Sequence, residues 1–175
     1  MKIGPQADET LQEIIDRKTK EEAAFGYSFW GYGGNLIDPI RVVQPFAEKY
    51  AAKGQNVKVL FVTTKSLFKG NHIPRATKYS KDGVSWNAIP RGMKITVSKS
   101  ALKIKNLHKC DFDLSLCDYR VALGPSAGRV LSNYFRLHTD KAVAYKEINS
   151  DMADEKVTIS YAADLVEPYA VRLKH

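Results

Sequence analysis

Eleven lysine and arginine residues between positions 65 and 109 are the side chains of this sequence best suited to hold a ligand. The 175-residue chain has 27 basic and 19 acidic residues and a formal net charge of +8, and this segment contains one of the acids, Asp82. A one-signed stretch of this size creates a local positive field, which favours a nucleic acid, a nucleotide or an acidic surface as the partner. Residues 65–109 are called the basic segment below.

The basic segment combines cations with aromatic rings on which a base can stack. Lysine outnumbers arginine there, which favours contacts with phosphates over the reading of base edges. Lys103 and Lys105 alternate with Leu102 and Ile104, so we expect both lysines on one solvent-facing side of a strand. The alternative is a solvated face that protects an edge strand from pairing. The candidate anion-binding residues are Lys65, Lys69, Arg75, Lys78, Lys81, Trp86, Arg91, Lys94, Lys99, Lys103 and Lys105.

Two glycine-containing turns, at residues 31–35 and 124–128, each follow an expected strand and precede an expected helix. Backbone N–H groups in such turns can hold a phosphate. Neither turn has the Gly-Lys-Ser/Thr ending of a P-loop or a complete G-x-G-x-x-G, and tight turns alone would explain the glycines. The candidate phosphate-binding residues are Gly33, Gly34, Asn35, Ser126, Gly128 and Arg129.

His72 and Ser126 are the candidates for catalysis. His72 lies among cations and could exchange a proton with a phosphate-containing substrate, although no carboxylate partner is evident. Ser126 fits the G-x-S-x-G pattern of serine hydrolases, but the chain is short for that fold and Pro125 restricts the preceding backbone. The sequence therefore leaves open whether the protein is an enzyme.

Cys110 and Cys117 are the two cysteines, and they form no framework for a zinc site because a second pair is missing. We expect no metal and no cofactor. Two cysteines also indicate a reduced, cytoplasmic setting. The apolar runs are too short to cross a membrane, so we expect no membrane partner.

The N-terminal half predicts a helix over residues 10–24, with Thr10 and Glu13 at capping-box spacing, and a strand over 25–32. Asp38 followed by Pro39 is typical of a helix start, and Val57–Thr64 is the clearest strand. Together these elements suggest a βαβ-like unit over residues 27–64.

The C-terminal half predicts more strands than helices. We expect a long loop over 65–86, two short strands within 88–105, a strand over 119–123, a helix over 129–137, and strands over 141–148, 157–161 and 166–173. The fold class is thus α+β (mixed α/β): residues 1–175 as a single compact domain, with one mixed β-sheet and two or three packed helices.

Three hypotheses for function follow from these patterns. The first is a binding module for an anionic partner, foremost a nucleic-acid backbone, through the basic segment. The second is a nucleotide-binding or nucleotide-processing enzyme that uses the two glycine turns. The third is an interaction or inhibitor domain that docks on an acidic protein.

Overall fold

The computed structural model describes all residues except 7, 34–37, 66–73, 97, 138–139 and 148–154. The chain forms two compact units. Unit 1 comprises Met1–Ile3, Leu60–Thr64 and Lys109–Ala162, and unit 2 comprises Gly4–Val59, Lys65–His108 and Ala163–His175. Three strands, β3 (Lys58–Thr63), β6 (Ser100–Ser115) and β9 (Lys156–Lys174), contribute residues to both units. That residues 1–175 form a single compact domain stays a prediction.

Helix α1 (Leu11–Phe25) of unit 2 begins and ends as its sequence predicts. Thr10 and Glu13 form the reciprocal hydrogen bonds of a capping box, and Gly26 ends the helix with a φ of 75°. Ile14 and Ile15 are buried, so the apolar stripe of this largely polar helix faces the interior.

Strand β2 (Ser28–Gly31) pairs antiparallel with β6, so that Phe29 lies opposite Lys103. It does not pair with β3, whose neighbours are β1 (Lys2–Ile3) and β9. The expected βαβ-like unit is therefore wrong, although its elements exist. Helix α2 (Pro39–Ala51) starts at the Asp38 cap as predicted and continues through Pro45 without ending.

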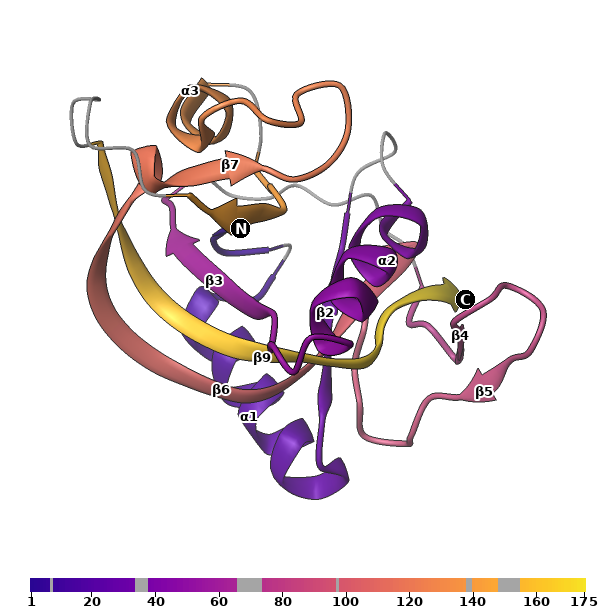
Figure 1. Cartoon of the computed structure of the whole chain (residues 1–175). Coiled ribbons are helices and arrows are strands. Elements are labelled where there is room, and N and C mark those ends of the chain that lie inside the picture. Colours follow the sequence, from indigo (N-terminus) through magenta and orange to yellow (C-terminus); the bar gives the residue numbers. More distant parts are fainter. Residues whose placement is uncertain (7, 34–37, 66–73, 97, 138–139, 148–154) are drawn as a thin grey trace. The chain divides into compact units, whose positions relative to one another are not determined.

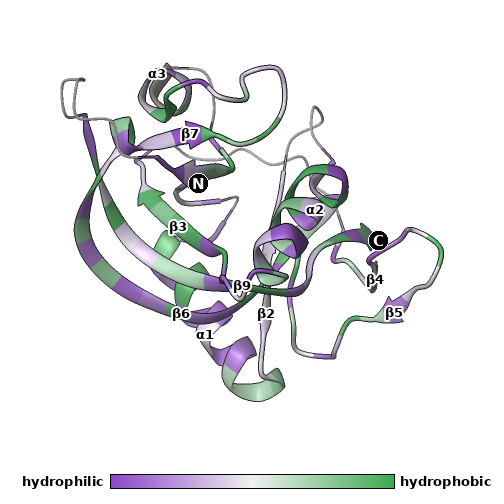
Figure 2. Ribbon diagram, viewed as in Figure 1, coloured by the Kyte–Doolittle hydropathy of each residue, from purple (hydrophilic) through white to green (hydrophobic). Residues whose placement is uncertain are grey.

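Strand β6 is longer than its hydrophobic pattern predicts. Ile104 and Leu107 are both buried although they are three residues apart, because Asn106 between them has a φ of 54° and interrupts the alternation. The carboxylate of Glu22 accepts hydrogen bonds from the backbone N–H groups of Asn106 and Leu107 at this irregularity. Hydrophobic and hydrophilic segments alternate along much of the strand in Figure 2.

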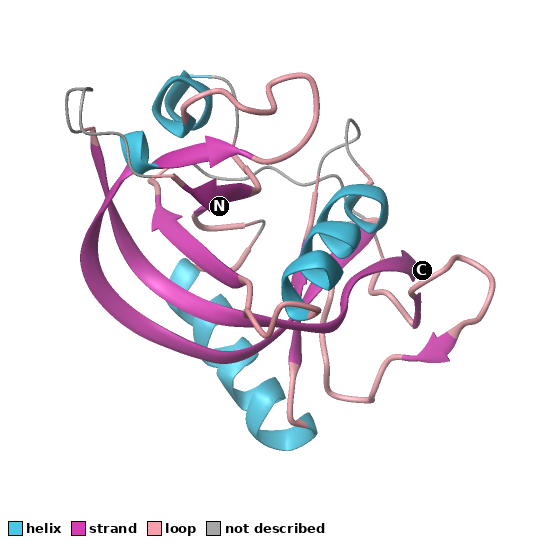
Figure 3. Ribbon diagram, in the orientation of Figure 1, coloured by secondary structure: helices cyan, strands magenta, loops and turns pink. Residues whose placement is uncertain are grey.

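The basic segment contains short strands where we expected a long loop. Strand β4 (Lys78–Ser80) pairs antiparallel with β5 (Asn87–Ala88) on one side and with the end of β9 on the other. Strand β9 is continuous where the sequence predicts two strands (Figure 3). Asp164, which lies between the two predicted strands, is accommodated in β9 because its carboxylate binds Lys58 and Asn106.

The core of unit 2 surrounds Phe29, which is completely buried. The ring of Tyr27 meets Phe29 edge-on with centroids 5.4 Å apart, and the ring of Tyr79 lies 4.9 Å away. Met93 and Val171 are also fully buried in this cluster. Tyr79 is therefore partly buried and packs against the core with its ring next to Phe29.

Unit 1 has a smaller core between helix α3 (Leu131–Leu137) and the antiparallel pair of β7 (Tyr119–Val121) and β8 (Ala144–Lys146), two strands that α3 separates in the sequence. Leu116, at the start of the short 3-10 helix Leu116–Asp118, packs with Val121, Leu131 and Phe135. The seven-stranded sheet is mixed, because β1 pairs parallel with β3 whereas β2 with β6 and β4 with β9 pair antiparallel, and β7 and β8 form a separate antiparallel sheet. The predicted α+β class is confirmed (Figure 1).

Candidate nucleic-acid interface

Lys78 and Lys174 lie directly opposite each other on the antiparallel strands β4 and β9. Residues in such positions project from the same face of a sheet, with Cβ atoms about 4.5–5.5 Å apart, and two like charges there repel each other. Neither ammonium group forms an ion pair with any residue that the structure describes. The fold thus holds two cations together without neutralising them.

Trp86 adds an aromatic ring to this pair. It precedes β5 and is two residues from Ala88, which pairs with Lys78, and the Nζ atom of Lys174 lies 5.7 Å from the centroid of its indole ring. This distance permits a cation–π attraction between the two side chains. Lys78, Trp86 and Lys174 are called the lysine face below.

The turn between β4 and β5 is fixed by its own hydrogen bonds. The carboxylate of Asp82 accepts from the backbone N–H groups of Ser85 and Val84 and from the Ser80 hydroxyl, and these bonds lower the pKa of Asp82 to about 2. The one acid of the basic segment therefore stays ionised at neutral pH, with its Oδ1 atom engaged by the turn.

Arg172 supports the same turn from strand β9. Its guanidinium donates to Asp38, which also caps α2, at 2.7 Å. A Cβ atom at Gly83 would lie 2.6 Å from the Nη1 atom of Arg172, and Gly83 has a φ of 82°. Position 83 thus favours glycine for its backbone conformation, and a side chain there would also displace the end of the Arg172 side chain.

Sequence analysis did not identify Lys174 and Arg172 as site residues because they lie far beyond the basic segment. Leu173 is buried between these two cations, and Val171 is buried before them. This alternation of apolar and basic residues at the end of β9 is the signal that could have identified them.

Lys99 and Lys81 lie in segments next to the strands that carry Lys78 and Lys174. The N–H group of Leu173 donates to the carbonyl of Lys99, which places Lys99 on the side of β9 away from β4. Lys81 directly follows β4. Both residues are exposed and form no ion pair with the described part of the chain.

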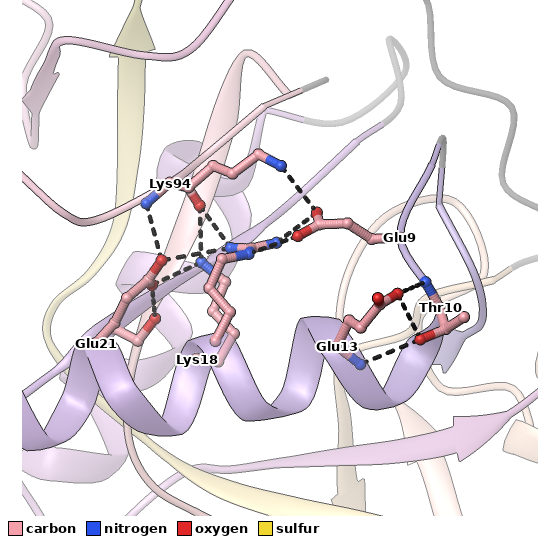
Figure 4. A network of polar contacts seen from close by, with 8 residues as sticks. Glu9, Thr10, Glu13, Lys18, Glu21 and Lys94 are labelled. Atoms are coloured by element: carbon pink, nitrogen blue, oxygen red, sulfur yellow. Dashed lines mark hydrogen bonds and ion pairs between the residues drawn. The ribbon is translucent and has the colours of Figure 1, made fainter.

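Lys94 is paired with an acidic side chain of the protein itself, although its own side chain is 40% exposed (Figure 4). Its Nζ atom lies 3.4 Å from the carboxylate of Glu9, and its backbone N–H donates to Glu21. Its carbonyl accepts from Arg17 and Lys18. Lys94 therefore joins α1 to the following loop and is a poor candidate for anion binding.

Arg75 and Lys103 are also partly engaged. The guanidinium of Arg75 donates to the carbonyl of Met93. The ammonium group of Lys103 lies 4.3 Å from the ring centroid of Tyr27, and burial, followed by the charge of Lys105, lowers its pKa. The two lysines that we expect on one solvent-facing side of a strand differ in exposure, because Lys105 is exposed and Lys103 is half-buried.

The remaining candidates of the basic segment, Lys65 and Arg91, are exposed. Lys69 and the catalytic candidate His72 lie outside the described residues, as do Gly34 and Asn35. Gly33 precedes them, close to Ser98.

The turn at residues 124–128 uses its own backbone donors. The N–H groups of Ala127, Gly128 and Arg129 donate to the carbonyls of Gly124, Val121 and Ser126, respectively. These amides are therefore not directed at a phosphate. The Ser126 hydroxyl has no described hydrogen-bond partner that could activate it as a nucleophile.

Within the described part of the chain, no three histidine, cysteine or acidic side chains are grouped so that they could hold a metal ion. None of the helices described is both long and apolar enough to cross a membrane. Comparisons of the chain with models of protein families, with curated proteins and with solved structures find no match.

Proposed function

We propose that this protein is a binding module for nucleic acid, which it holds by the phosphate backbone on the lysine face. The observation that carries this proposal is the opposition of Lys78 and Lys174, which have no counter-ion among the described residues. A phosphate placed between the two ammonium groups would remove their repulsion and gain two charge-assisted hydrogen bonds. The alternative is a purely structural role, in which these exposed lysines protect the edge of the sheet from pairing with other chains.

The chemistry of the lysine face favours backbone contacts over the reading of sequence. Ammonium groups are compact point charges, whereas base edges are read mainly by forked guanidinium or amide groups. Arg172, the arginine of β9, is already engaged by Asp38. Binding is therefore expected to depend strongly on salt and weakly on base sequence.

We also propose a cytoplasmic setting, which agrees with the absence of a disulfide between Cys110 and Cys117.

An acidic protein presents the same charge as a nucleic acid, so the experiment must separate these two partners. The site geometry gives no support for a nucleotide-processing reaction at residues 124–128.

A fluorescence-anisotropy titration with a labelled oligonucleotide at about 50 and 200 mM salt tests the proposal. We expect binding at the lower concentration and a loss of at least tenfold at the higher one. Absence of binding at low salt would contradict the proposal. Capture of one acidic protein in equal amounts after nuclease treatment would then point to the acidic-protein partner.

A further inference from the structure

Trp86 is placed where it can meet a ligand, unlike the other tryptophan of the chain. Trp30 is 8% exposed within β2, whereas Trp86 is half-buried and precedes β5, the last strand in its order across the sheet. The aromatic rings of Tyr27 and Tyr79 pack against the core. Trp86 thus combines partial exposure with a neighbouring cation, Lys174, that has no ion-pair partner among the described residues.

The turn that carries Trp86 is ordered before any ligand arrives. The Asp82 carboxylate binds the backbone at Val84 and Ser85, and the Ser80 hydroxyl accepts from the N–H of Gly83. A ring on a fixed turn loses little conformational entropy when it stacks. The fixed turn also holds Val84 with 82% of its surface exposed.

From this arrangement we infer that the lysine face takes single-stranded nucleic acid, with the indole of Trp86 stacked on an unpaired base while Lys78 and Lys174 hold the adjacent phosphates. A duplex keeps its bases stacked on one another and offers this surface only phosphates, so the indole would contribute nothing. A single strand offers both phosphates and base faces. The inference rests on the proposed function and names the form of its ligand.

Three probes of about twelve nucleotides, a length within the usual site size of single-strand binders, separate the contributions. They are an oligothymidylate single strand, a duplex, and an abasic oligonucleotide that carries phosphates without bases. We expect the single strand to bind about tenfold more tightly than the abasic probe, because one stacked base contributes roughly that factor. The duplex should also bind more weakly than the single strand.

Variants at two positions of the turn assign this preference to the ring. Trp86→Ala should abolish the preference for bases, while Trp86→Phe should retain part of it. Val84→Ala removes an apolar side chain from the same turn without removing a ring, and it should keep the full preference. Oligothymidylate should quench the tryptophan fluorescence of the natural protein and leave that of Trp86→Phe, which reports only Trp30, unchanged.

The outcomes separate the inference from the proposed function. Equal affinity for the single strand and the abasic probe would overturn the single-strand inference and leave phosphate binding intact. A base preference that survives in Trp86→Ala would also overturn it. Failure of all three probes to bind at low salt would overturn the proposed function itself.

Discussion

The basic segment contains lysines in two opposite situations. Lys94 belongs to a network on α1 in which each charge has partners, whereas Lys78 faces Lys174 without a counter-ion among the described residues. Both residues count equally in the net charge of the sequence. The comparison shows that the positive charge a basic segment can offer to an anionic ligand depends on which of its lysines the fold has already paired with acids.

The α1 network is satisfied even though its central pair is buried. Lys18 and Glu21 are 4% and 3% exposed, and their charged atoms lie 2.9 Å apart. Glu21 also accepts from the Ser28 hydroxyl and the Lys94 N–H. Burial alone would raise the pKa of Glu21, but the charge of Lys18 and these hydrogen bonds hold it below its usual value. The network secures α1, while the lysine face leaves its charges for a ligand.

The largest expected effect is the loss of stability when the network is broken. Glu21→Ala would leave the Lys18 ammonium buried without its carboxylate and should lower the free energy of unfolding by about 3–5 kcal/mol. Asp16→Ala on the same helix, which removes an exposed carboxylate bonded to Gln12, is the control and should cost less than about 1 kcal/mol. Chemical denaturation measures both, and equal losses would contradict the description of the network.

The buried lysine also predicts how stability changes at high pH. Burial lowers the pKa of Lys18 to about 8 in the folded protein, against 10.5 as its ordinary value. Between these pH values the unfolded chain binds more protons at this site, so the free energy of unfolding should rise with pH relative to Lys18→Met. The gain should be on the order of 2–3 kcal/mol. Denaturation of both proteins from about pH 7.5 to 10.5 checks the sign, and a constant difference would refute it.

Neutralising one lysine from each region should separate binding from stability. Lys78→Gln should weaken oligonucleotide binding several-fold, because it removes a phosphate contact, and should leave the fold intact. Lys94→Gln makes the same change in net charge but removes a side chain already paired with Glu9. Its affinity per folded molecule should stay near that of the natural protein. Equal losses of affinity would show that only total charge matters.

Two glycines test whether the shape of the β4–β5 turn is needed for binding. Gly83 and Gly124 have φ values of 82° and 81°, so alanine at either position should cost about 1–2 kcal/mol of stability. Alanine at 83 would also collide with Arg172, whereas nothing lies within 4 Å at 124. Gly83→Ala should therefore reduce oligonucleotide affinity and Gly124→Ala should not. Unchanged binding by Gly83→Ala would show that the turn can deform without consequence.

The smallest expected effect is a gain of stability at the binding site. Lys78→Glu would replace a repulsive cross-strand pair with an attractive one opposite Lys174, which should add about 0.2–1 kcal/mol to the free energy of unfolding. The same variant should bind nucleic acid poorly. A loss of stability would mean that the two ammonium groups are not in conflict in the natural protein.

Elements defined by local signals could be predicted from the sequence. The Thr10–Glu13 capping box and the Asp38–Pro39 start located two helices, and the apolar run at 57–64 located β3. Each of these signals involves residues close together in the chain, which is why a reading of the sequence succeeds there.

The two long strands and the pairing of charges depend on contacts between distant residues. Strand β6 passes through Asn106 because Glu22, 84 residues earlier, binds its backbone N–H. Lys94 is paired with Glu9 and bonded to Glu21 of α1, and Lys78 gains its neighbour from the last strand. No fixed spacing in the sequence separates these residues from their partners. The composition could therefore indicate a basic surface for an anionic partner, but not which lysines form that surface.

The salt dependence of oligonucleotide binding, compared between two double charge reversals, tests binding at the lysine face most directly. Lys78→Glu with Lys174→Glu changes the lysine face, and Lys20→Glu with Lys49→Glu makes the same charge change at exposed positions of α1 and α2. We predict that the first variant binds far more weakly and that its log–log salt slope falls by about 0.7 for each single-strand phosphate that the protein no longer neutralises. The second should keep the slope of the natural protein. Equal slopes and affinities in the two variants would contradict binding at the lysine face.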